Sequence, residues 1–168
     1  PALPGEKPTL SDWADHLTTV FPEARLKRFI ETRGADGGPW RRLCALPALW
    51  VGLLYDQTAL DAAWDLAKGW DAATRDALRV AASVDGLQGE ANGVRLLDVA
   101  REVVDIAHAG LAARARPGAG GLIPDETHFL NALKDSVATG VGPADELIAR
   151  YESDWNGDAA RVFGEYSY

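Results

Sequence analysis

Apolar side chains recur at intervals of three and four residues along most of this chain, which is the spacing of one face of an α-helix. The clearest stripe covers residues 94–114 and holds Leu96, Ala100, Val103, Val104, Ala107 and Leu111. Weaker versions of the pattern predict helices over residues 10–20, 57–68, 71–83, 127–139, 143–155 and in the last stretch, 158–168. The sequence therefore predicts a mainly α-helical fold.

A strongly apolar segment runs from Trp40 to Leu54. Because it is apolar on most sides, it predicts a helix that is buried in its native surroundings. Pro47 lies inside this segment, and a proline there either kinks one helix or separates two helices. The sequence leaves both alternatives open.

One segment has the alternation of a β-strand instead. From Leu26 to Arg33, alternation places Lys27, Phe29, Glu31 and Arg33 on one face and the other four residues on the opposite face. Neither face is wholly apolar, so we expect a sheet with one side turned to a polar cleft. A single strand forms no sheet, so its partners lie either in segments that the pattern does not mark or outside this chain.

Candidate chemistry gathers around this strand and the loop after it. On a strand, Glu31 and Arg33 face the same way, roughly 7 Å apart, so the carboxylate can hold a cation while the guanidinium holds phosphate oxygens. The glycine-rich loop 34–39 lets backbone amides approach a ligand, and Arg41 and Arg42 begin the next helix, where anions are favoured. A Glu-x-Arg pair on a strand is nevertheless more often an ordinary solvent-facing ion pair.

The chain is acidic, with a net charge of −8 and a pI of about 4.8. Binding to the phosphate backbone of nucleic acids needs a concentrated cationic face, so nucleic acid is excluded as a general partner. Basic side chains do gather locally, at Arg25, Lys27 and Arg28 and again at Arg41 and Arg42. Such clusters on an acidic protein point to a small anionic ligand.

The longest apolar run, Ala45–Tyr55, is far shorter than the ~20 residues that span a bilayer, so we expect no membrane partner. No charged leader with an apolar core opens the chain, and the expected location is the cytoplasm. Cys44 is the only cysteine, so no disulfide forms within these 168 residues, and its apolar neighbours predict a buried side chain. None of the three histidines has the spacing of a metal site.

The motif that holds these candidates is long, since residues 26–56 read LKRFIETRGADGGPWRRLCALPALWVGLLYD. It closely resembles a signature of the glutamate–cysteine ligases of plants and proteobacteria. The preceding residues 12–25, DWADHLTTVFPEAR, and the stretch from residue 138 to residue 168 are also similar to this family. The similarity covers nearly the whole chain, and residues 71–95 and 115–125 match less well.

The resemblance implies the carboxy-terminal helical portion of a glutamine-synthetase-like ligase fold, which is α+β in the parent and has an antiparallel sheet along the active site. It implies that ATP phosphorylates the γ-carboxylate of glutamate and that the amine of cysteine then displaces phosphate. By resemblance, Glu31 is a ligand of Mg2+ and Arg33 binds the transferring phosphate. Arg41 and Arg42 lie in the signature and are candidates for binding the cofactor, with helix capping and core anchoring as open alternatives. ATP and Mg2+ are thus the expected cofactors, and glutamate and cysteine the expected substrates. The family usually has methionine where Thr32 stands, on the face opposite Glu31.

Members of this family are much longer, and the present chain matches only their carboxy-terminal part. The chain also lacks methionine, even at position 1. We therefore expect a single carboxy-terminal segment, with a signature region at 1–56 and a helical region at 57–168, which requires the missing amino-terminal part and is inactive alone. Two alternatives remain: a non-catalytic helical interaction module derived from the ligase, and a stand-alone binding protein that reused this segment.

Overall fold

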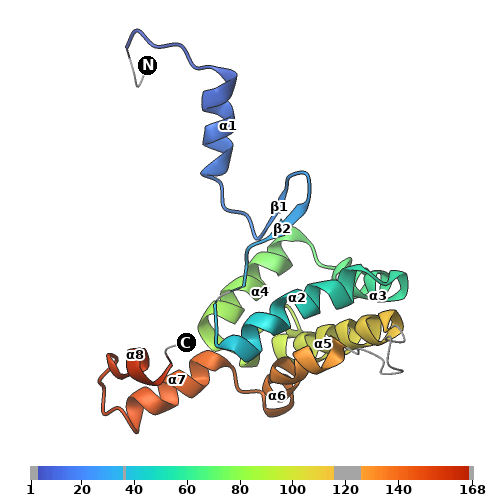
Figure 1. Ribbon diagram of the computed structural model, residues 1–168, viewed down its shortest axis with the longest axis vertical. Coiled ribbons are helices and arrows are strands. Elements are labelled where there is room, and N and C mark those ends of the chain that lie inside the picture. The colour runs from blue at the N-terminus through green and yellow to red at the C-terminus, as the bar shows by residue number, and fades with distance from the viewer. Residues whose placement is uncertain (1–3, 36, 116–125, 167–168) are drawn as a thin grey trace, which may run out of the picture. The chain divides into compact units, whose positions relative to one another are not determined.

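The computed structural model describes residues 4–35, 37–115 and 126–166, and in them the chain is mainly helical, as predicted (Figure 1). The chain divides into two compact units, Pro1–Asp36 and Gly37–Tyr168, which we call unit 1 and unit 2. Each unit has its own elements and is considered by itself.

Unit 1 consists of a helix and a hairpin. Helix α1, Leu10–Thr18, begins with a capping box in which Thr9 and Asp12 exchange hydrogen bonds between side chain and backbone. None of the residues of α1 is buried. Strands β1, Ala24–Leu26, and β2, Ile30–Thr32, pair antiparallel.

The prediction of one strand over residues 26–33 was wrong, because the chain turns back between Leu26 and Ile30. The partner strand that the sequence left unplaced is β1, which directly precedes the turn. In the observed register Arg25 lies opposite Glu31 and Ala24 opposite Thr32, so residues of the same parity share a face. The alternation therefore continues through the turn, and a period-2 pattern cannot distinguish this hairpin from a single strand.

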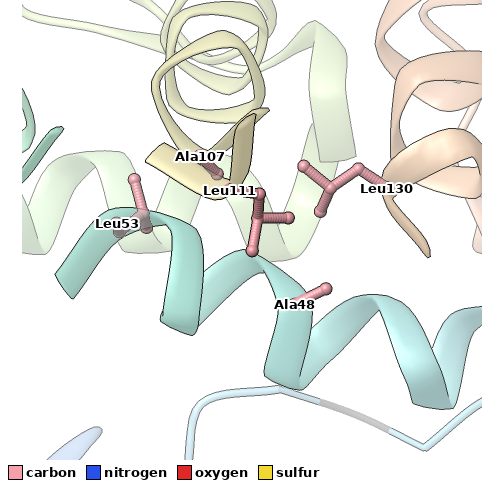
Figure 2. Packing of buried hydrophobic residues seen from close by; sticks show 5 residues of the cluster. All are labelled: Ala48, Leu53, Ala107, Leu111 and Leu130. Atoms are coloured by element: carbon pink, nitrogen blue, oxygen red, sulfur yellow. The ribbon is translucent and has the colours of Figure 1, made fainter. Parts of the chain in front are cut away.

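The core of unit 2 lies where helices α2, Trp40–Leu54, and α5, Leu96–Arg114, pack against each other. Figure 2 shows five of its side chains, which come from α2, α5 and the 3₁₀ segment η2, Glu126–Leu130: Ala48, Leu53, Ala107, Leu111 and Leu130. Helix α2 is continuous from Trp40 to Leu54 with Pro47 inside it, which decides between the two alternatives left open by the sequence. It is only partly buried, since Trp40 is 76% exposed.

Two glycines set the close approach of α2 and α5. A Cβ atom on Gly52 would collide with the backbone carbonyl of Ala107, and one on Gly110 would collide with the backbone carbonyl of Gly52. The two backbones thus lie against each other with no side chain between them. Any larger residue at either position has to push the helices apart.

Unit 2 has five more helices among the described residues. They are α3, Gln57–Ala67; α4, Ala72–Asp85; α6, Asn131–Thr139; α7, Pro143–Glu152; and α8, Arg161–Glu165. Of these, α3 and α6 contact α5. Residues 85–93, which lie between two predicted helices and which the sequence predicts as a loop, include the 3₁₀ turn η1, Gly86–Gln88, and strand β3, Glu90–Ala91, which pairs with β4, Val94–Arg95. Residues 117–121, whose Pro-Gly-Ala-Gly-Gly sequence predicts a connection between helices, lie outside the described residues.

No single helix in the described parts of the chain is long and apolar enough to cross a membrane, although α2 and α3 pass that test together as a pair bent by 94°.

Candidate functional site

The predicted pair Glu31 and Arg33 lies on a charged face of the hairpin in unit 1. Arg33 donates from Nη1 to Oε1 of Glu31 at 3.0 Å. Arg25, directly across the ladder, donates from Nε at 2.9 Å and from Nη2 at 2.8 Å to Oε2 of the same carboxylate. The Nζ of Lys27 lies 3.6 Å from Oε2. One carboxylate is therefore surrounded by three cationic side chains, which we call the hairpin charge cluster.

This arrangement favours the ionised form of Glu31. The hydrogen bond from Arg25 is the largest cause that lowers the pKa of Glu31 below its ordinary value, and the positive charges of Arg25, Lys27 and Arg33 act in the same direction. Partial burial opposes the shift without reversing it. The carboxylate is thus ionised at neutral pH, as both a metal ligand and an ion-pair partner must be.

Arg33 is anchored at both its backbone and its side chain. Its backbone N–H donates to the carbonyl of Glu23 at 2.8 Å, which continues the β1–β2 ladder by one residue pair. Its guanidinium lies over the ring of Phe21, 4.7 Å from the centroid. With 29% of its side chain exposed, Arg33 stays accessible to a ligand.

Glu31 is a carboxylate, the type of ligand that Mg2+ takes, but both of its oxygens accept hydrogen bonds from arginine side chains in this structure. Magnesium in phosphate-transfer sites is held by one or two carboxylates together with substrate phosphates and water. The described residues contain no group of three or more histidine, cysteine, aspartate or glutamate side chains suited to a metal.

Arg41 and Arg42 begin α2 in unit 2, as predicted, but their side chains differ in surroundings. The Nη2 atom of Arg42 lies 3.4 Å from Oε2 of Glu146 on α7, and only 15% of the arginine side chain is exposed. Arg41 is exposed and lines a cavity of about 290 Å³ together with Trp40, Cys44 and Asp135. The two arginines are therefore unequal candidates for a ligand: Arg41 is accessible, whereas Arg42 ties α2 to α7.

Several contacts of the candidate site were not foreseen from the sequence. Arg25 was noted only as part of a basic cluster, Phe21 was assigned no role, and the partner of Arg42 lies on a distant helix. A hairpin signal would have located Arg25, because any antiparallel pairing about a turn at 27–29 places it opposite Glu31. Cys44, expected to be buried, is half-exposed.

The comparisons with known proteins agree with this motif. The model of Glutamate-cysteine ligase family 2 (GCS2) matches residues 4–165. The chain belongs to this family. Among curated relatives, the chloroplastic glutamate–cysteine ligase of Arabidopsis thaliana is 49% identical over all 168 residues, and that of Medicago truncatula is 47% identical over the same length. The enzyme of Solanum lycopersicum is also 47% identical.

The chain spans about a third of the length of these relatives, namely 31% of the Arabidopsis thaliana protein and 32% of the Medicago truncatula protein. This extent agrees with the expectation that the chain corresponds to one segment of a longer ligase.

The comparisons overturn the expected cytoplasmic location, because these relatives are all chloroplastic enzymes. The cytoplasmic prediction rested on the lack of a leader and of a spanning segment in the chain, and neither feature separates the cytoplasm from the interior of a plastid.

Proposed function

We propose that this chain is part of an ATP-dependent ligase that forms γ-glutamylcysteine from glutamate and cysteine, the first step of glutathione synthesis. The observation that carries the proposal is the hairpin charge cluster, which places Arg33 and an ionised Glu31 3.0 Å apart within the family's signature. Phosphoryl transfer needs a cation-binding carboxylate and a guanidinium that stabilises the transferring group.

The proposed reaction has two steps. A γ-carboxylate oxygen of glutamate bonds to the γ-phosphorus of ATP, and the bond from that phosphorus to the bridging oxygen breaks, so that ADP leaves. The amine nitrogen of cysteine then bonds to the acyl carbon, the bond from this carbon to the phosphate oxygen breaks, and the nitrogen loses a proton. Phosphate departs with the bonding electron pair.

The proposed roles follow from the contacts of each side chain. Glu31 is one ligand of Mg2+, which neutralises phosphate charge when bound. Arg33 directs its remaining donors toward the oxygens of the transferring phosphate, whose charge grows in the transition state. Arg41, accessible at the start of α2, is the stronger candidate of the two helix arginines for a nucleotide phosphate, because Arg42 already pairs with Glu146.

We also propose that the hairpin is part of a larger sheet in the complete protein, because a glutamine-synthetase-like fold has an antiparallel sheet along its active site. Opposite its charged face, the cross-strand partners Leu26 and Ile30 are 83% and 63% exposed. Two strands with an exposed apolar pair are marginal alone. We assign the missing strands, the other metal-binding carboxylates and most substrate contacts to the part of the ligase outside this chain.

The alternatives are a non-catalytic helical interaction module and a stand-alone binding protein. The test compares the purified 168 residues with a complete ligase that contains them, by following ATP-, Mg2+- and cysteine-dependent formation of γ-glutamylcysteine. We expect product from the complete ligase and none from the 168 residues alone. A complete protein that forms no product would favour the alternatives, and product from the isolated chain would contradict the assignment of essential ligands to other parts.

A further inference from the structure

Phe21 is a large apolar side chain that is 71% exposed, on the segment that leads into the hairpin. It precedes Pro22, and a residue before proline is held in extended backbone conformations. The hydrogen bond from Arg33 N–H to the Glu23 carbonyl shows that the ladder reaches this segment. The chain bends at Glu23, so Phe21 lies before strand β1, and its place beside the hairpin is given by its contact with Arg33.

The ring of Phe21 is the second group that contacts the Arg33 guanidinium, beside Glu31. Glu31 Oε1 accepts a hydrogen bond from Nη1 of the guanidinium at 3.0 Å, and the Cζ atom of the guanidinium lies over the ring of Phe21, 4.7 Å from its centroid. An attachment through one hydrogen bond alone leaves rotation about that bond, whereas a second contact with the ring restricts it. The planar guanidinium is suited to such stacking on an aromatic ring.

Glu31 is itself fixed, because two donors of Arg25 bind its other oxygen. The chain of contacts Phe21–Arg33–Glu31–Arg25 thus holds the guanidinium from two sides. Phe29 offers an internal comparison. It is 62% exposed in the same hairpin, yet the cation over its ring is Lys27, at the longer distance of 5.9 Å.

We infer that Phe21 is a positioning residue that holds the Arg33 guanidinium in place for the transferring phosphate, an inference that rests on the proposed ligase function. The other reason for an exposed phenylalanine is an apolar contact with the rest of a complete ligase. The two roles differ in chemistry, because leucine preserves an apolar contact but not a π-face, whereas tyrosine preserves the π-face.

The first measurement uses the 168-residue chain and needs no activity. An aromatic ring shifts the proton resonances of a group stacked on its face to lower frequency. We expect the side-chain Nε–H and Cδ protons of Arg33 to show this ring-current shift in the unchanged chain and in Phe21→Tyr, and to lose it in Phe21→Leu. Phe29→Leu is the matched control and should leave the Arg33 resonances in place.

The second measurement uses the complete ligase. Phe21→Leu should lower kcat on the order of 10-fold with little change in KM for ATP, because a misplaced guanidinium loses contacts in the transition state more than in the ground state. Phe21→Tyr should restore most of the turnover, and Phe29→Leu should match the unchanged enzyme.

Normal turnover in Phe21→Leu would overturn the inference while leaving the ligase function intact, and so would a kcat equally low in Phe21→Leu and Phe21→Tyr. If the Arg33 resonances are the same in Phe21→Leu and in the unchanged chain, the ring does not lie on Arg33, and this result also overturns the inference. If the unchanged complete protein forms no γ-glutamylcysteine, the proposed function fails and the catalytic role of Phe21 fails with it, while the resonances still report whether the ring lies on Arg33.

Discussion

The side chain of Arg33 in the hairpin charge cluster is held by Glu31 through a hydrogen bond and by the ring of Phe21, over which its guanidinium lies. A surface ion pair alone contributes little to stability, so restraint from two directions is more than the fold of a short hairpin requires. Such restraint is what a group needs if it must meet developing charge without first reorganising. At this scale, the contacts favour a role for Arg33 in chemistry over a role in stability.

Removal of the Arg33 guanidinium tests that role directly. In a complete ligase, we expect Arg33→Ala to lower kcat on the order of 10²-fold or more, because one donor to the transition-state charge is lost. The measurement is steady-state formation of γ-glutamylcysteine at saturating substrates. Arg28→Ala, which removes the same charge from the turn of the same hairpin, is the control and should keep nearly full turnover. Near-normal turnover in Arg33→Ala would show that the contact between Arg33 and Glu31 is an ordinary ion pair without a catalytic role.

The sequence predicted that Glu31 and Arg33 face the same way, because residues two apart share a face in a strand, and their direct contact is the ion pair that it left as the alternative. It could not predict Arg25, since the turn that brings it opposite Glu31 lacks a strong turn signature such as Asn-Gly. Nor could it predict the partner of Arg42, because Glu146 lies 104 residues away and only the packing of α7 brings the two together. Contacts set by local periodicity are readable from one sequence, and those set by tertiary packing are not.

At the scale of elements, α2 and α5 owe their contact to small residues as much as to apolar ones. Periodicity predicted the apolar stripes and the helix Trp40–Leu54, since a helix needs only its own residues to display the pattern. The pattern could not reveal how closely α2 and α5 approach. That distance depends on Gly52 and Gly110, which lie against the facing backbones.

Filling this contact should destabilise the chain. We expect Gly52→Ala and Gly110→Ala each to lower the free energy of unfolding by about 1–3 kcal/mol, because the added methyl group overlaps a backbone that cannot move away without opening the core. Chemical denaturation of the 168-residue chain measures the change. Gly69→Ala is the matched control, since a methyl group there meets no atom within 4 Å, and it should shift stability by no more than about 0.5 kcal/mol. Equal stability of all three variants would contradict the close packing.

A second element-scale prediction concerns the start of α4. The side chain of Asp71 accepts from the backbone N–H of Thr74 at 2.8 Å, and this backbone hydrogen bond is the main cause that lowers the pKa of Asp71 from its ordinary 3.8. Because the folded pKa lies below the unfolded one, the contribution of the cap is complete above pH 3.8 and is lost as the pH falls from there through the lowered pKa.

The measurement is the pH dependence of unfolding by denaturant in the acid range. Asp71→Asn keeps an acceptor at the cap but does not titrate, so its stability should fall less steeply with decreasing pH than that of the unchanged chain. Identical pH dependences in the two proteins would exclude a contribution from ionised Asp71.

At the scale of the molecule, the two units differ in what they bury. Within the described residues, every buried side chain belongs to unit 2, from Ala45 to Trp155, and none belongs to unit 1. The chain also covers about a third of the length of its relatives. In a protein of that full length, the exposed residues of unit 1 would have much further protein to contact. Unit 1 carries the proposed chemistry and unit 2 carries the core, so activity and stability of this chain should be separable.

Deletion of residues 1–36 tests that separation. We expect residues 37–168 to unfold cooperatively, with a free energy of unfolding within about 0.5 kcal/mol of the full chain, because buried apolar surface dominates stability and the deletion removes none of the buried residues. Circular dichroism during denaturant titration measures both proteins, and Gly52→Ala in the shortened chain should cost as much as in the full one. The complete ligase without these residues should in contrast lose all synthesis of γ-glutamylcysteine, since Glu31 and Arg33 go with them. A shortened chain that unfolds at much lower denaturant would mean that unit 1 stabilises the core, and the stability of this segment could then no longer be assigned to unit 2 alone.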